Sequence, residues 1–164
     1  MALYGLVNAM LPIIAYNYGN ENKKRAKDAL MWGYLYGAII ALLGIVVFEA
    51  VPKELLLLFN LDEEWVNTGV ILTRIIAPTF ILASICILSN GVLQAFGNGI
   101  HPMIITGLRL LVILFPACFL FGYYFGIDGI WWGSYVAEFV AAVYAMVLTY
   151  FVYKKKTHRQ TVVS

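Results

Sequence analysis

ALMWGYLYGAIIALLGIVVFEAV, residues 29–51, carries one charge, Glu49, and that charge lies at the far end of the stretch. A helix that crosses the hydrocarbon core of a bilayer, about 30 Å thick, needs about 20 predominantly apolar residues. The stretch meets this requirement, so we predict a transmembrane helix. Three glycines within it, Gly33, Gly37 and Gly44, predict close contacts with neighbouring helices, because small residues let helix backbones approach one another in lipid.

The same pattern of apolar runs between charged segments extends along the whole chain. Of the 164 residues, 62% are hydrophobic and 12% are charged, and the mean hydropathy is +0.83. A soluble domain has about 25% charged residues. We therefore predict an all-α, polytopic transmembrane bundle that forms one region, residues 1–164. Its predicted spans are 2–16, 29–51, 68–96, 102–125 and 131–153.

The first of these runs, 2–16, is too short to cross a bilayer and is interpreted as the second half of a span. A signal peptide is the alternative. The run lacks a basic segment before it, contains Pro12, and continues into Asn17 and Tyr18 rather than a small-residue cleavage site. A second proline, Pro78, is expected to kink the span 68–96.

The distribution of Lys and Arg predicts the orientation of the spans, since cytoplasmic loops are enriched in both. One loop carries Lys23, Lys24, Arg25 and Lys27, and alternation from there makes segment 52–67, with its single Lys53, external. The basic tail then lies inside; its residues are Lys154, Lys155, Lys156 and Arg159. The prediction is a multi-pass membrane protein with a cytoplasmic C-terminus.

No pattern of catalytic or metal-binding residues is present, so we expect neither an enzyme nor a protein with a cofactor. His101 and His158 have no second ligand at metal spacing. Cys86 and Cys118 lie inside apolar spans, where we interpret them as packing residues. The basic clusters lie beside spans and are not interleaved with aromatic residues, so nucleic acid is not an expected partner.

Ionisable residues within the spans are the strongest functional signal, because a charge in the membrane is costly and usually faces a bundle interior or a water-filled cavity. Arg74 and Arg109 lie about two turns from span ends, so both are expected to reach the interface by snorkelling. Glu138 has a shorter side chain. A desolvated carboxylate of this kind is suited to carry a proton or pair with a cation, and the alternative is a structural hydrogen bond to a neighbouring helix.

Polar residues also interrupt the span 68–96. They are Ser84, Ser89, Asn90 and Gln94. Together with Glu138 they are the candidates for an ion or substrate pathway. The alternative is that they hold helices together, since hydrogen-bonding and small residues promote helix packing in lipid.

Several strings resemble the second half of bacterial multidrug and toxic compound extrusion (MATE) transporters. PIIAYNYGN at 12–20, followed by NKKR at 22–25, is similar to the end of the eighth helix and the next cytoplasmic loop. RIIAP at 74–78, NGVLQAFG at 90–97 and GIWW at 129–132 follow in the same order. The resemblance covers essentially the whole chain and implies the end of helix eight and all of helices nine to twelve.

The resemblance implies a pump that exports small organic cations or amphiphilic compounds, driven by a Na⁺ or H⁺ gradient. Its implied partners are membrane lipid and the N-terminal helices that this chain lacks. Some family members carry a coupling carboxylate on the tenth helix, but the span 68–96 contains no Asp or Glu. Two alternatives remain open, a flippase of lipid-linked saccharides from the same superfamily and a non-transporting membrane fragment.

Overall fold

The structure, a computed structural model, describes the backbone of residues 1–59 and 63–163 and the side chains of 1–59, 65–126 and 129–155. Within these ranges the chain is helical and contains no strand, which confirms the all-α class. The helices are α1 (Ala2–Gly19), α2 (Lys23–Ala50), α3 (Pro52–Leu57), α4 (Glu63–Ile76), α5 (Thr79–Ala95), α6 (Ile100–Gly107), the π-helix η1 (Leu108–Leu114), α7 (Phe115–Phe125) and α8 (Ile127–Val163).

Three of the described helical segments are long and apolar enough to cross a membrane: Lys23–Ala50, Ile100–Phe125 and Gly129–Lys155. A fourth crossing is formed if α4 and α5 are taken as one bent span. The bend between Trp65–Ile76 and Thr79–Ala95 is 54°. These segments overlap the four predicted full spans, and they support a multi-pass membrane protein.

The bend between α4 and α5 lies at Pro78, as the sequence predicts. Proline has no backbone N–H to donate and its ring clashes with the preceding turn, so the helix breaks there. The Thr79 hydroxyl donates a 2.7 Å hydrogen bond to the Ile76 carbonyl, which satisfies one of the carbonyl groups left at the end of α4.

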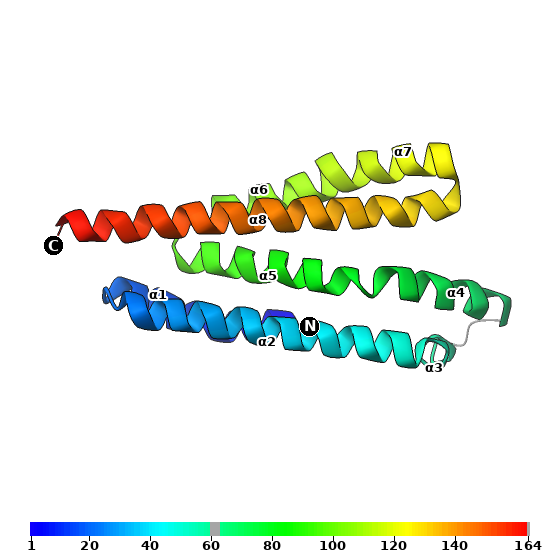
Figure 1. The fold of residues 1–164 in the computed structure, drawn as a ribbon, viewed down its shortest axis with the longest axis horizontal. Coiled ribbons are helices and arrows are strands. Elements are labelled where there is room, and N and C mark those ends of the chain that lie inside the picture. The colour runs from blue at the N-terminus through cyan, green and yellow to red at the C-terminus, as the bar shows by residue number, and fades with distance from the viewer. Residues whose placement is uncertain (60–62, 164) are drawn as a thin grey trace.

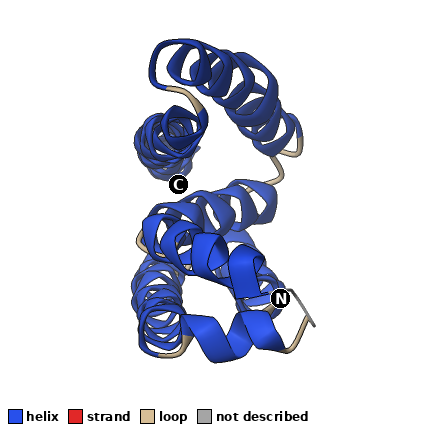
Figure 2. Cartoon of the chain, turned by 90° about the vertical axis from the view of Figure 1, so that its right-hand side faces the viewer, coloured by secondary structure: helices blue, strands red, loops and turns tan. Residues whose placement is uncertain are grey.

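Helix α5 lies at the centre of the bundle. It packs against α1 and α2 on one side and against α8 on the other, and α8 also packs against η1 and α7. Figure 1 shows the helices running side by side along one axis. Figure 2, which views the bundle from its end, shows α5 between two groups of helices, one formed by α1 and α2 and the other by α8, η1 and α7. Two small cores hold these groups together. One contains Val7, Met10, Ile14, Leu88, Val92, Ala95 and Phe96, and the other contains Cys86, Leu93, Ile105, Ala141, Ala142 and Ala145.

Glycines permit the closest helix contacts. A Cβ at Gly33 would overlap Met10 of α1, and one at Gly37 would overlap Leu88 of α5, so both predicted close contacts are confirmed. At Gly44 a Cβ would lie 3.4 Å from the Phe80 ring, an ordinary van der Waals distance. The tightest backbone approach, which the sequence did not predict, is at Gly129 of α8, where a Cβ would overlap the Phe121 carbonyl oxygen of α7; at Gly133 a Cβ would lie 2.9 Å from the Cys118 Cα.

The two ends of the bundle differ in charge. The α1–α2 turn, the α5–α6 turn and the C-terminal part of α8 lie at one end, and α3 and the α7–α8 turn lie at the other (Figure 1). The first end carries the described basic side chains Lys23, Lys24, Arg25, Lys27, Lys154 and Lys155. Lys156, His158 and Arg159 lie outside the described side chains. The arrangement agrees with alternating spans, while the cytoplasmic placement of this end stays a prediction.

Candidate functional site

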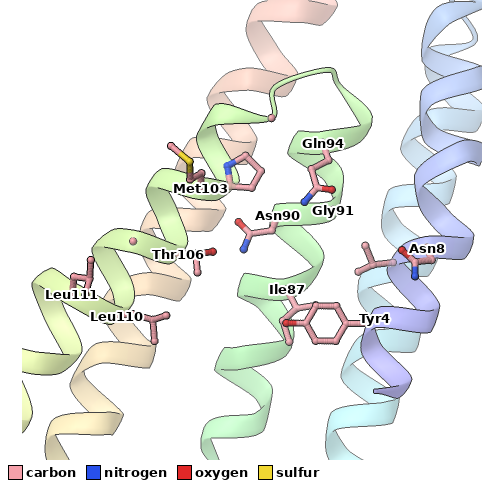
Figure 3. A pocket seen from close by; sticks show the side chains of 14 residues that line it. Tyr4, Asn8, Ile87, Asn90, Gly91, Gln94, Met103, Thr106, Leu110 and Leu111 are labelled. Carbon is pink, nitrogen blue, oxygen red and sulfur yellow. The ribbon is translucent and has the colours of Figure 1, made fainter.

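A cavity of about 730 Å³ lies between α1, α5 and the α6–η1 segment and is partly open on one side. Its polar lining comes from three helices: Asn8 of α1, Asn90 and Gln94 of α5, and Thr106 of α6. The rest of the lining is apolar or aromatic and includes Tyr4, Ile87, Met103, Leu110 and Leu111 (Figure 3). Drug-sized ligands occupy pockets of about 300–1,000 Å³ with this kind of mixed lining.

Two of the predicted pathway residues, Asn90 and Gln94, face this cavity. They are four residues apart on α5, a spacing that puts both on one face of a helix. Figure 3 shows Asn90 and Thr106 pointing toward each other from α5 and α6. The Asn90 side-chain oxygen is buried and has no hydrogen-bond partner among the described residues. A buried amide oxygen without a partner is costly, so this acceptor is available to a ligand or to water.

Ser84 and Ser89, predicted on the same span, do not line the cavity. Ser89 is fully buried, and its Oγ lies 2.8 Å from the Tyr34 hydroxyl of α2, with which it shares a hydrogen bond. Ser84 donates a 2.7 Å hydrogen bond to the Ile81 carbonyl of its own helix. The alternative interpretation, that polar residues hold helices together, therefore describes Ser89, which joins α5 to α2, whereas Ser84 bonds within α5 and Asn90 and Gln94 line the cavity.

Glu138 lies on α8 and forms an ion pair with Arg109 of η1, apart from the residues that line the cavity. The Arg109 and Glu138 side chains are 27% and 15% exposed. The expectation that Arg109 snorkels to the interface is therefore wrong, because an acidic partner within the bundle holds its guanidinium group.

Arg74 makes a different kind of ion pair. Its Nε lies 3.8 Å from Glu49 Oε2 of α2, and the two side chains are 58% and 41% exposed. An exposed pair at this distance contributes about 0–1 kcal/mol to stability. Of these two pairs, only Arg109–Glu138 is largely buried.

The cavity residues contributed by α1 and α6 were not predicted from the sequence. Asn8 and Thr106 are isolated polar residues in apolar runs, and that isolation was the signal that could have singled them out. Tyr4 gave no such signal, because an aromatic residue in a span is common. In the part of the chain that the structure describes, no group of three or more His, Cys, Asp or Glu residues could hold a metal ion.

The cavity can bind a ligand through hydrogen bonds and through an aromatic surface, because amide, hydroxyl and ring groups line it. No Lys, Arg, Asp or Glu is among its lining residues. The face of a tyrosine ring attracts organic cations within about 6 Å of its centroid. Such a lining suits ligands that are largely apolar and carry one cationic or hydrogen-bonding group.

Comparison with known proteins links the chain to transporters. The family model MatE matches residues 1–120. "Multidrug export protein MepA" of Staphylococcus aureus is 28% identical over 150 residues, which cover 92% of this chain and 33% of that protein. The protein of the same name from Staphylococcus saprophyticus is also 28% identical over 150 residues. The chain thus spans about a third of the length of the curated relatives it matches.

Solved structures have the same fold. An inward-facing multidrug resistance MATE family transporter of the MOP superfamily superposes with a TM-score of 0.88 at 19% identity, over 95% of this chain and 37% of that one. The MATE multidrug transporter DinF-BH superposes with a TM-score of 0.83 at 27% identity, over 92% of this chain and 34% of that one.

Proposed function

This chain belongs to the MatE family, and from that premise we propose that it is the C-terminal part of a multidrug efflux antiporter. The proposed substrates are cationic or amphiphilic organic compounds. The proposed partners within the protein are the further helices that the relatives carry outside the matched third. We use "complete transporter" for a protein that contains this chain together with such helices.

The observation that carries the proposal is the cavity with the unpartnered Asn90 oxygen. It has a suitable volume, it opens on one side, and its walls come from α1, α5 and α6. In inverted-repeat and two-lobe transporters the substrate site lies at an interface between the two halves. A second lobe packed over the open part of this cavity would enclose it.

The coupling ion is proposed to be Na⁺ or H⁺, bound by carboxylates outside this chain. No Asp or Glu lines the described cavity, and the segment 68–96 contains none. We propose that Glu138 acts indirectly, as a positioning residue. Its ion pair with Arg109 holds η1, whose Leu110 and Leu111 form part of the cavity wall.

The lining also bears on the rival proposal of a lipid-linked saccharide flippase. A site for an anionic pyrophosphate-linked substrate would call for basic side chains, since Arg and Lys recognise phosphate by charge-assisted hydrogen bonds. Neither Arg74 nor Arg109 lines the cavity. This favours export of neutral or cationic compounds over the flippase proposal.

Ethidium efflux from cells tests the proposed function. We expect efflux with the complete transporter, at a rate that depends on the Na⁺ concentration or on pH. We expect the rate with the 164-residue chain alone to equal that of a vector control, because one part of one lobe cannot enclose a path. Absence of ion-dependent efflux from the complete transporter would contradict the proposal and favour the flippase or the non-transporting fragment.

A further inference from the structure

A second, smaller groove lies between α2 and α8, away from the cavity described above. Its volume is about 290 Å³ and it is largely open. Six residues line it: Leu30, Tyr34, Met146, Thr149, Tyr150 and Tyr153. Leu30, Tyr34 and Tyr153 also pack on the core cluster that contains Leu88 and Val92 of α5, so α5 supports the groove from behind.

The groove is almost entirely apolar, and its polar groups are hydroxyls. Tyr34 uses its hydroxyl to bind Ser89. Thr149 is 8% exposed, and its hydroxyl makes no hydrogen bond within the described residues, although the Tyr34 hydroxyl lies near it. An apolar channel with one buried, unpartnered hydroxyl suits an acyl chain joined to an ester oxygen.

Basic residues continue the walls of the groove toward the charged end of the bundle. On α2, Lys27 precedes Leu30 and Tyr34 by three and seven residues, which places all three on one helical face. On α8, Lys154 follows Tyr150 by four residues, again on one face. Both lysines are exposed, so each wall of the groove ends in an accessible cation.

The cations on α2 lie where the helix itself disfavours them. Lys23, Lys24, Arg25 and Lys27 occupy the start of α2, and its first turn holds no acidic residue. The N-terminus of a helix carries a partial positive charge, which favours anions and repels cations. Asn22 caps the helix by accepting a 3.2 Å hydrogen bond from the Arg25 backbone N–H. An anion bound beside Lys27 would offset part of this unfavourable charge.

We propose that this groove binds one anionic phospholipid of the adjacent leaflet, with an acyl chain along the groove and the phosphate between Lys27 and Lys154. Basic pockets between transmembrane helices bind anionic headgroups in this way. Thr149 precedes Lys154 by five residues, about 7.5 Å along the helix. The headgroup region of a leaflet is about 5–7.5 Å thick, so Thr149 lies at the depth of the ester groups when Lys154 meets the phosphate.

Native mass spectrometry of the 164-residue chain in detergent tests the proposal by titration with phosphatidylglycerol or phosphatidylcholine. We expect one saturable site that prefers phosphatidylglycerol. Replacing both Lys27 and Lys154 by Gln should weaken phosphatidylglycerol binding about thirtyfold, since each cation near a headgroup contributes about one factor of five. Lys53→Gln, at the opposite end of the bundle, should leave it unchanged.

Groove variants separate a lipid site from a merely charged surface. Thr149→Phe fills the groove and is expected to weaken phosphatidylglycerol binding, whereas Val147→Phe, at an exposed position of the same helix, is expected to leave it unchanged. Circular dichroism checks that each variant keeps its helicity. Equal affinity for the two lipids, or full binding by the Lys27→Gln, Lys154→Gln double variant, would overturn the proposal. If a Thr149→Phe variant that keeps its helicity bound phosphatidylglycerol as the parent does, the groove would not be the binding site.

Discussion

Replacing Glu138 by Ala is expected to lower the free energy of unfolding of the chain by about 3–5 kcal/mol, because Arg109 would keep a buried charge without a partner. The pair joins η1 to α8, and both side chains are less than one-third exposed. Loss of one partner removes the attraction and leaves the desolvation cost of the other, which membrane depth increases. Unfolding in mixed micelles with increasing SDS, followed by circular dichroism, measures the change.

Two variants test whether the effect comes from the buried pair. Glu49→Ala removes the partner of Arg74 from an exposed pair and should cost at most about 1 kcal/mol. Replacing Arg109 and Glu138 together by Leu should recover most of the stability lost in Glu138→Ala, since neither charge is then left alone. If Glu138→Ala and Glu49→Ala lowered the free energy of unfolding by the same amount, the result would contradict a buried Arg109–Glu138 pair.

Replacing Asn90 by Trp in the complete transporter is expected to reduce ethidium efflux to the rate of a vector control. The indole ring would occupy the cavity between α5 and α6 and remove the unpartnered acceptor. Asn90→Leu keeps the volume but loses the amide, so we expect about a tenfold lower rate, the equivalent of one net hydrogen bond. Efflux is measured at matched protein levels in the membrane.

The matched control places the same ring on a surface away from the cavity. Val140 of α8 is exposed and does not line the cavity, so Val140→Trp should leave efflux near the parent rate. Normal efflux by the Asn90→Trp variant, expressed at the parent level, would show that the cavity is not part of the substrate path.

The sequence predicted the spans and the bend at Pro78 because both depend on local chemistry. An apolar run long enough to cross a bilayer must satisfy its backbone hydrogen bonds internally, and helix formation achieves this. Proline breaks a helix whatever surrounds it. The positions of Lys and Arg along the chain also predicted that basic residues lie in alternate loops, which the helices bring to one end of the bundle (Figure 1).

The sequence could not predict which polar residues face the cavity. Ser89 and Asn90 are neighbours, but successive residues on an α-helix point about 100° apart. Ser89 therefore meets Tyr34 of α2 while Asn90 faces α6. Which direction leads to a cavity depends on where the neighbouring helices pack, and no local pattern contains that information.

The Arg109–Glu138 pair escaped prediction for the same reason. The two residues are 29 positions apart, and their contact depends on how η1 packs against α8. Arg109 lies in a π-helical segment, whose extra residue in the turn changes the direction of its side chains relative to an α-helix. If the whole span is treated as an α-helix, with about 3.6 residues per turn, the predicted direction of the Arg109 side chain is therefore wrong.

The central claim is that the cavity between α1, α5 and α6 opens to transported compounds, and thiol labelling tests it most directly. In the complete transporter with Cys86→Ala and Cys118→Ala, an Asn90→Cys variant would be treated with a hydrophilic thiol reagent, with and without saturating ethidium. We predict labelling that ethidium slows several-fold, and no labelling of the buried position in a Ser89→Cys variant. An unreactive Asn90→Cys variant, or one labelled at the same rate with ethidium present, would contradict the claim.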